Sequence, residues 1–295
     1  MALQFPEGLK RRSSGIAIAL KEAGFFVVIS GDPCYGACDL ATGLLGYVDA
    51  VIHFGHSPLE CNPSILYEPF HQDFEIDSLE LAIPFLTGNE IGFVTTIQHT
   101  HMAPAIEAFF SGRNITCRAY LGSARTPSPG QILGCSYEAA RICPGTEILF
   151  IGTGAFHPLG VALATGRKVI ALDPYTRSVQ VVSVERFLRQ RFALIEKARD
   201  AGNFGIILSE KSGQRRQELA ERLAGLKKEA VIIAMNKVNP DELLNLGFGA
   251  YVNTACPRLA YDDQSRFPVP VLTPCEFEIL CGIVKFEDYQ VDEIV

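Results

Sequence analysis

The sequence contains no long apolar run and no block of like charges. Its longest apolar stretches, such as residues 23–30 and 230–235, are far shorter than the roughly 18 residues that span a bilayer. The first residues, MALQFPEGLKRR, lack the apolar segment of a signal peptide. The net charge is −7, from 33 Asp plus Glu and 26 Lys plus Arg. We therefore expect a globular cytoplasmic protein that binds neither a membrane nor free nucleic acid.

Close cysteine pairs are also scarce. Cys34 and Cys38, in CYGAC, form the only near pair among nine cysteines, and an odd number of thiols in a reducing compartment argues against a disulfide framework. Three lone thiols recur once in each third of the chain, in turns with Gly or Pro near expected strands: Cys38 (YGAC), Cys135 (LGC) and Cys256 (ACPR). We expect these three to share one site. The other lone thiols are expected to be packing residues: Cys61, Cys117, Cys143 and Cys281.

Short β-branched runs alternate with longer amphipathic stretches, a pattern typical of α/β proteins. Because apolar parallel strands need helical crossovers, we expect mostly parallel sheets flanked by helices. The expected strands are residues 25–30, 50–54, 91–96, 147–152, 168–172, 204–208, 230–235, 250–253 and 269–272, and the clearest helices are residues 104–111, 184–201 and 213–226.

A degenerate internal repeat divides the chain into three. AVIHFGHSPL (50–59), ILFIGTGAFHPLG (148–160) and AYVNTACPRLA (250–260) each run from a strand into a small-residue turn and a proline. VVISGDPCYG, GFVTTIQHTHM and GIILSEKSGQRR match as the first strand of each unit. We therefore expect three pseudo-repeated α/β domains, residues 1–88 with Cys38, 89–183 with Cys135 and 184–295 with Cys256. The carboxyl ends of their strands can face one central site.

Three thiolates without a fourth partner suit a [4Fe-4S] cluster with one iron left open to a substrate. Structural zinc is the first alternative, although such sites favour CxxC pairs. A catalytic cysteine with a histidine base is the second, because His53, His56, His99, His101 and His157 lie near expected strand ends. That alternative leaves two of the three thiols unexplained.

Several segments together resemble the diphthamide synthase family. They are LQFPEGL (3–9), GDPCYGACDLA (31–41), HFGHSPL (53–59), LGC (133–135), NTACPRLAYDD (253–263) and FPVPVLTPCEFE (267–278), so the resemblance spans nearly the whole chain. It implies an atypical radical S-adenosylmethionine (SAM) transferase without a CxxxCxxC loop. It also implies that Cys38, Cys135 and Cys256 bind the [4Fe-4S] cluster. The roles of Cys34 and Cys275 stay open.

The resemblance further implies a reaction and its partners. The reduced cluster would break the bond from the SAM sulfur to the aminocarboxypropyl carbon and release methylthioadenosine. The 3-amino-3-carboxypropyl radical would then add to C2 of a histidine on translation elongation factor 2, the first step of diphthamide biosynthesis. A homodimer and an electron donor are implied as well. No catalytic side chain is expected beyond the cluster ligands, because the cofactor supplies the chemistry and the protein the positioning.

SAM binding calls for backbone N–H groups and small residues that allow close approach. The candidates lie in turns after expected strands: Gly55, His56 and Ser57, then Gly152, Thr153, Gly154 and His157. Asp173, after another strand, could accept the ribose hydroxyls or serve as a cap or turn residue. A basic stretch could meet the SAM carboxylate or the acidic side of a partner, or be a solvated helix N-terminus. Its residues are Lys211, Gln214, Arg215 and Arg216.

Two other functions stay open. A quinolinate-synthase-like enzyme also places three cysteines from three pseudo-symmetric domains around a [4Fe-4S] cluster, and SAM turnover separates it from the first reading. A non-catalytic cluster or scaffold subunit is the second alternative. Such a subunit is expected to lack part of the cysteine set, so the presence of all three thiols favours a catalytic subunit.

Overall fold

The structure is a computed structural model that describes residues 1–59 and 62–294, so Cys61 lies outside the described residues. The chain divides into two compact units. The first contains Met1–Ile132, Glu138–Thr153 and Leu172–Val179, and the second contains Leu133–Tyr137, Gly154–Ala171 and Gln180–Val295. The three domains expected from the repeat, with boundaries near residues 88 and 183, stay a prediction.

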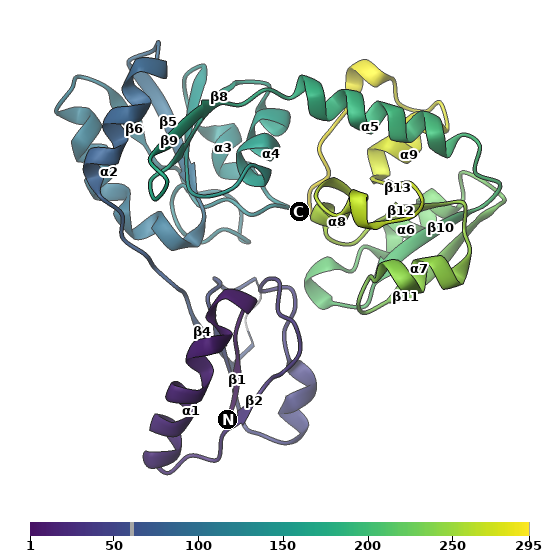
Figure 1. The fold of residues 1–295 in the computed structure, drawn as a ribbon, viewed down its shortest axis with the longest axis horizontal. Helices are drawn as coiled ribbons and strands as arrows, with labels where there is room; N and C mark the ends of the chain where they lie inside the picture. Colours follow the sequence, from purple (N-terminus) through teal and green to yellow (C-terminus); the bar gives the residue numbers. More distant parts are fainter. Residues whose placement is uncertain (60–61, 295) are drawn as a thin grey trace. The chain divides into compact units, whose positions relative to one another are not determined.

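Three sheets form, one in each third of the chain (Figure 1). The first has the order β2 (Val28–Ile29), β1 (Ala2–Gln4), β3 (Val51–Phe54), β4 (Ile65–Glu68). The second has the order β6 (Thr116–Arg118), β5 (Glu90–Thr95), β7 (Glu147–Ile151), β8 (Lys168–Asp173), β9 (Ser178–Val181). The third has the order β11 (Ala230–Met235), β10 (Phe204–Ser209), β12 (Ala250–Asn253), β13 (Val271–Leu272).

The internal repeat is a repeat of strand order. In every sheet, the strand that comes first in the sequence has the second strand on one side and the third on the other. The fourth strand then pairs with the third. The pairs β1–β3, β5–β7 and β10–β12 are parallel, which confirms the expected α/β class with mostly parallel sheets. The matching of first strands is wrong for the first unit, because β1 is its first strand and VVIS contributes β2, its second.

Helices connect the strands. They are α1 (Ser13–Glu22), α2 (Ala103–Ser111), α3 (Glu138–Ile142), α4 (Phe156–Thr165), α5 (Glu185–Ala198), α6 (Gln217–Ala224), α7 (Pro240–Leu246), α8 (Pro257–Tyr261) and α9 (Pro274–Leu280). Short 3-10 helices are η1 (Glu7–Arg12), η2 (Thr42–Gly46), η3 (Ile76–Phe85), η4 (Ile97–Met102), η5 (Ser212–Gln214), η6 (Gln264–Arg266) and η7 (Phe286–Asp288). Among the described residues, no helix has the length and apolar character needed to cross a bilayer.

Helices cover both faces of the third sheet. Ile206 and Val252 pack in a cluster with residues of α5, α6 and α9. Ile207 and Tyr251, their neighbours in sequence, pack on the other face with residues of α7 and α8. Successive strand residues point to opposite faces, so a strand buried on both sides must be apolar throughout. This explains why FGIIL in β10, where every residue is buried, is a continuous apolar run.

A buried ion pair joins α5 to α9 across this core. Arg191 donates to Glu276 through Nε (2.7 Å) and a terminal nitrogen (2.6 Å). Two further N–H groups donate to the carbonyl oxygens of Ala260 and Val271. Glu276 also completes a capping box with Thr273 at the start of α9. Four of the five guanidinium N–H groups and both carboxylate oxygens are therefore hydrogen-bonded, which compensates the burial of the two charges.

The predicted thiols lie in loops that the repeat makes equivalent. Cys38 follows β2 and precedes β3, whereas Cys135 follows β6 and precedes β7. Cys256 follows β12, the third strand of its sheet. The packing prediction is confirmed for three other thiols, because Cys117 and Cys143 are buried and Cys281 packs against the core of the third sheet.

Candidate functional site

A side chain of β1 holds the Cys38 loop in the first unit. Gln4 donates from Nε2 to the carbonyl of Asp39 (2.6 Å) and accepts at Oε1 from the backbone N–H of Ala41 (3.0 Å). These two bonds fix the orientation of the amide. Cys38, the residue before Asp39, is partly buried. Gln4 therefore positions the backbone beside the first predicted cluster thiol.

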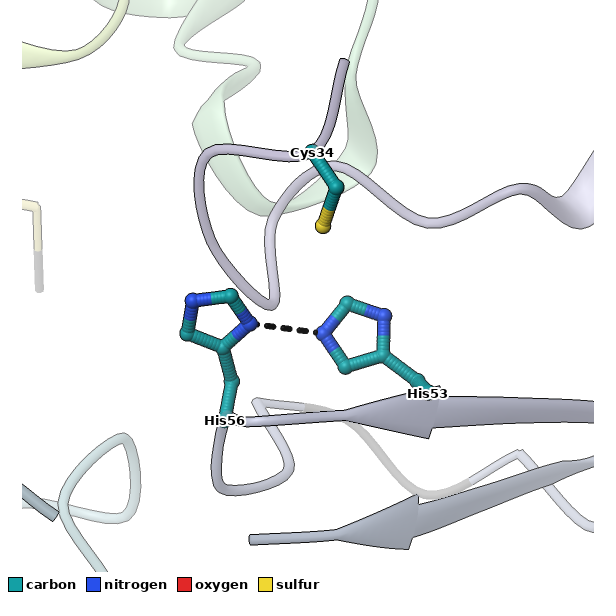
Figure 2. A group of neighbouring side chains, drawn as sticks. All are labelled: Cys34, His53 and His56. Atoms are coloured by element: carbon teal, nitrogen blue, oxygen red, sulfur yellow. Dashed lines mark hydrogen bonds between the residues drawn. The ribbon is translucent and has the colours of Figure 1, made fainter. Parts of the chain in front are cut away.

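Beside this loop, Cys34, His53 and His56 gather into one group (Figure 2). Their ligand atoms all lie within 4.8 Å of one another. His53 belongs to β3, and its Nδ1 lies 2.8 Å from Oε1 of Gln4. Its Nε2 lies 2.9 Å from Nδ1 of His56. Cys34 is 1% exposed and His53 is fully buried, so the group is closed to solvent on the side of the strand.

Burial keeps both imidazoles neutral at physiological pH. Desolvation, with a smaller contribution from His56, lowers the pKa of His53 to about 3. Desolvation also lowers the pKa of His56 to about 4, against an opposing effect of Asp39. Because Oε1 of Gln4 can only accept, Nδ1 of His53 carries the proton and its Nε2 presents a lone pair. Nδ1 of His56 is then the donor in the histidine pair.

The Cys135 loop, in the second unit, is a tight turn. The backbone N–H of Leu133 donates to the carbonyl of Ser136 (3.0 Å), and the N–H of Ser136 donates back (3.2 Å). Gly134 and Cys135 form the tip. A Cβ at Gly134 would lie 2.2 Å from a ring carbon of Phe156, so only glycine allows this turn to pack against α4. The glycine of the LGC motif therefore permits the tight turn that carries the Cys135 thiol.

Cys256 occupies the N-cap position of α8. Asn253, the last residue of β12, donates from Nδ2 to the carbonyl of Cys256 (2.8 Å) and accepts from the N–H of Ala255 (3.1 Å). Pro257 then begins the helix, where its fixed φ is favourable and its missing N–H costs nothing. The NTACP sequence thus fixes the backbone on both sides of the thiol.

Arg216, from another part of the chain, also holds the Cys256 loop by hydrogen bonds to its backbone. It donates to the carbonyl oxygens of Thr254 (2.7 Å) and Ala255 (3.1 Å). Its terminal nitrogens also bind both oxygens of Asp292 (2.7 and 2.8 Å), and one reaches the carbonyl of Glu293 (3.0 Å). All five guanidinium N–H groups are therefore used. Arg216 is therefore not a solvated residue at the helix start, because its side chain is 13% exposed and paired with Asp292. The suggestion that this basic stretch meets the SAM carboxylate or a partner stays a prediction.

Residues 291–294 connect the two thiol loops of the second unit. The N–H of Ile294 donates to the carbonyl of Cys135 (2.8 Å), and the carboxylate of Glu293 accepts from the N–H of Tyr137 (2.8 Å). Asp292, next along the chain, is the partner of Arg216. One extended segment thus holds the turn of Cys135 and, through Arg216, the turn of Cys256.

The phenol of Tyr137 lies in the electrostatic neighbourhood of both thiols. Its pKa is raised well above the usual range, first by desolvation and then by the charges of Tyr261, Cys135, Glu293 and Cys256. Its hydroxyl donates to the carbonyl of Gly134 (3.1 Å). The second unit therefore brings two of the three predicted cluster ligands to one place. Cys38 belongs to the first unit.

The donor chemistry of these loops fits an iron–sulfur cluster. Cys38, Cys135 and Cys256 are reduced and partly buried, as thiolates at a shielded but reachable cluster need to be. A Cβ at Gly36 would lie 3.3 Å from Sγ of Cys38, so glycine there leaves room around the sulfur. Cys275 differs, because it packs against the core and burial raises its pKa, which opposes the thiolate form.

The predicted SAM contacts lie in turns of the expected kind. Gly55, Gly152 and Gly154 all have positive φ, a region that side-chain-bearing residues avoid. A Cβ at Gly55 would lie 2.8 Å from a ring carbon of Pro6, so two segments of the first unit meet closely there. Ser57 is buried, and its hydroxyl accepts from Nε2 of Gln131 (2.6 Å).

The remaining SAM candidates have structural partners. One carboxylate oxygen of Asp173 accepts from the N–H groups of Tyr175 (2.9 Å) and Thr176 (3.1 Å), so Asp173 is a turn residue. Burial, followed by the charge of Arg258, lowers the pKa of His157 to about 4. Thr153 is exposed beside the glycine turn. The roles of these residues and of His56 in binding SAM stay predictions.

Comparison with known proteins gives consistent matches over the whole chain. Residues 5–290 match the family model described as "Putative diphthamide synthesis protein". The 2-(3-amino-3-carboxypropyl)histidine synthase of Pyrococcus horikoshii is 42% identical over 306 residues, which cover 99% of this chain and 88% of that protein. Subunit 1 of the Nematostella vectensis synthase is 30% identical, with 97% of this chain and 64% of that protein covered.

A solved structure agrees. The crystal structure of Dph2 from Pyrococcus horikoshii with a 4Fe-4S cluster superposes with a TM-score of 0.94 at 40% identity. The match covers 100% of this chain and 88% of that one. This likeness supports the α/β fold with three repeated sheets.

Proposed function

The chain belongs to the diphthamide synthesis family, and on that premise we propose that it transfers the 3-amino-3-carboxypropyl group of SAM to C2 of a histidine on elongation factor 2. Its 42% identity to a named synthase over 99% of the chain makes it a transferase of this family. The main support is the position of three cysteines in three sheets that share one strand order. Cys38 and Cys135 follow the second strand of their sheets, and Cys256 follows the third.

These three thiolates would hold a [4Fe-4S] cluster and leave one iron open. The Pyrococcus horikoshii protein holds such a cluster, and the partly buried thiols here have the donor chemistry that it needs. When bound, the cluster supplies the electron that cleaves SAM and the open iron that binds it. The remaining tasks of binding, orientation and shielding belong to the chain itself.

The residues around the thiols perform those tasks by fixing backbone. Asn253 and Arg216 hold the Cys256 turn, Ile294 holds the Cys135 turn, and Gln4 holds the Cys38 loop. Each of these hydrogen bonds is made to a backbone carbonyl in the thiol's own turn or loop. The positive-φ glycine turns supply backbone that can approach SAM closely. Positioning of this kind is the main contribution of a protein to cofactor chemistry.

The partners follow from the same proposal. A protein histidine must reach the reacting fragment, so the site needs an opening wide enough for a loop of elongation factor 2. The net charge of −7 indicates that shape and local contacts guide this docking, because no general basic field is available. A homodimer, an electron donor and a cytoplasmic location complete the proposal.

The test is product analysis with the reconstituted protein. The chain is loaded anaerobically with iron and sulfide, reduced with dithionite and given labelled SAM. We expect methylthioadenosine, and label on archaeal elongation factor 2 but not on a variant with its modifiable histidine changed to Ala. Mainly 5′-deoxyadenosine would contradict the bond assignment. Equal labelling of both proteins would contradict the acceptor, and quinolinate from iminoaspartate and dihydroxyacetone phosphate would establish the rival enzyme.

A further inference from the structure

We propose that Cys34, His53 and His56 form a binding site for a divalent zinc ion, separate from the three thiols assigned to the iron–sulfur cluster. Figure 2 shows the Cys34 sulfur directed toward the two imidazoles, whose facing nitrogens are hydrogen-bonded to each other. The three ligand atoms lie within 4.8 Å of one another. They come from two separate segments, the Cys38 loop and the end of β3.

The spacing is close to that of a tetrahedral zinc site. Zinc lies about 2.0–2.1 Å from a histidine nitrogen and about 2.3 Å from a thiolate, which places tetrahedral ligand atoms roughly 3.3–3.8 Å apart. On zinc binding, the distance between the His53 and His56 nitrogens, now 2.9 Å, would increase by about half an ångström. The longest distance between ligand atoms in the group would decrease by roughly one ångström. Rotation of side chains supplies movements of this size. Water would complete the coordination.

The surroundings of His53 resemble those of a metal ligand. Histidine ligands donate their second N–H to an oxygen acceptor that fixes the tautomer and the ring orientation. Nδ1 of His53 does so to Oε1 of Gln4 (2.8 Å), and Gln4 is itself fixed by Asp39 and Ala41. The pair Gln4 and His53 are direct neighbours in the β1–β3 register. Nε2 of His53 is therefore held with its lone pair toward Cys34 and His56.

The donor set selects the class of ion. Two imidazole nitrogens and one thiolate suit zinc, whereas magnesium and calcium prefer oxygen. Both imidazoles are neutral near pH 7, so no proton has to leave a charged ring when the ion enters. The proton on Nδ1 of His56 moves to its Nε2, and the thiol proton of Cys34 is released to solvent. Zinc uptake should therefore release protons.

The site would act on the cluster through the loop. Cys34 lies four residues before Cys38, and the ion would tie that part of the loop to the end of β3. In the second unit the corresponding restraint is the Arg216–Asp292 pair. The ion would be structural, and the three residues would be positioning residues for Cys38.

The test measures zinc and iron in the same protein. The full-length chain is stripped with a chelator, reconstituted with its cluster, equilibrated with zinc chloride and desalted. Wild-type protein and a Cys281→Ser control should each retain about one zinc per chain. Cys34→Ser and His53→Gln should lose it, and Gln4→Ala should bind zinc about 10- to 100-fold more weakly. Thermal melts establish that the Cys34→Ser protein is folded.

Iron content separates this inference from the proposed function. Cys38→Ala should lose iron and keep zinc, whereas Cys34→Ser should keep iron and lose zinc. X-ray absorption at the zinc edge should show one sulfur and two imidazole nitrogens. Zinc retained equally by the wild type and Cys34→Ser, or by neither, would overturn the site. Loss of iron from Cys34→Ser but not from His53→Gln, which also loses zinc, would instead make Cys34 a cluster ligand and overturn the separation of the two sites.

Discussion

The two units hold their thiol loops by different means. In the first, a neutral amide, Gln4, makes two backbone hydrogen bonds beside Cys38 and a third contact with His53. In the second, a guanidinium with all its donors engaged binds a buried carboxylate and the carbonyls before Cys256. A neutral network is inexpensive to bury, whereas a buried charge pair is costly to break. The second unit should therefore be rigid but intolerant of substitution, and the first more adaptable.

The largest effect should come from the thiols. We expect Cys38→Ala, Cys135→Ala and Cys256→Ala each to lose most of the visible thiolate-to-iron absorbance after reconstitution, because each removes one of three protein ligands. Iron and sulfide analysis provides the measure, with Cys281→Ala as the control. A Cys38→Ala protein that retains a full cluster while Cys34→Ala loses it would show that the ligand within CYGAC is the other thiol.

Removal of Arg216 should have the next largest effect. Arg216→Ala leaves Asp292 buried, with 6% of its side chain exposed, and without its counter-charge. Breaking a buried pair in this way costs about 3–5 kcal/mol of the free energy of unfolding. Arg216→Lys should recover part of the loss, since it restores the charge but not the bidentate geometry.

Urea denaturation measures the free energy of unfolding of the Arg216 variants, with Arg215→Ala as the matched control. Arg215 is exposed and its guanidinium bonds to Gln217 in the same helix region, so its removal should change stability by less than about 0.5 kcal/mol. The Arg216→Ala protein should also lose cluster, because the Cys256 turn is released. Equal stability of the two variants would remove the contrast between the units.

A smaller effect is expected from Gln4 in the first unit. Gln4→Ala leaves the N–H of Ala41 and Nδ1 of His53 without their acceptor, and an unsatisfied buried donor costs about 1–3 kcal/mol. Gln4 is 2% exposed, so water does not replace the amide fully. Denaturation of this variant beside Gln290→Ala, an exposed glutamine, gives the measure. A loss as large as that of Arg216→Ala would show that the first unit is held as tightly as the second.

Sequence reasoning found the strands that lie in continuous apolar runs, and missed strands that lie outside such runs. AVIIAM became β11 and AYVN became β12 with the expected bounds. The strands β1 and β6 have three residues each, too few for a period to be visible. The error in β1 shifted the alignment of the first unit, because the repeat was matched one strand too late.

The thiols of the site were predictable and their supports were not. Cys38, Cys135 and Cys256 stand in local turn motifs that can be read directly. Gln4 and His53 meet only because β1 pairs with β3, and Arg216 meets Asp292 across 76 positions of sequence. Such pairs depend on tertiary structure, for which a local pattern carries no signal. The basic stretch suggested a SAM carboxylate, a partner or solvent, whereas Arg216 is partly buried and paired with Asp292.

A fall in pH should gradually destabilise the first unit more than the second. His53, His56 and His157 have folded pKa values of about 3, 4 and 4, below the value of about 6.5 in an unfolded chain. The unfolded state therefore binds more protons between these values, and stability falls as pH falls below about 6.5. Each histidine contributes up to about 1.4 kcal/mol per pH unit. Two of the three belong to the first unit.

The second unit has an opposing group. Burial raises the pKa of Asp292 despite Arg216, so its folded form takes up a proton more readily than its unfolded form, and acid offsets part of the loss caused by His157. Hydrogen exchange in the presence of a chelator, from pH 7.5 to 5, should thus show earlier loss of protection at residues 51–54 than at residues 250–253. His56→Gln should flatten the slope of the first unit alone. An unchanged slope would mean that these histidines titrate normally, and that the closed neutral network around Gln4 does not persist in solution.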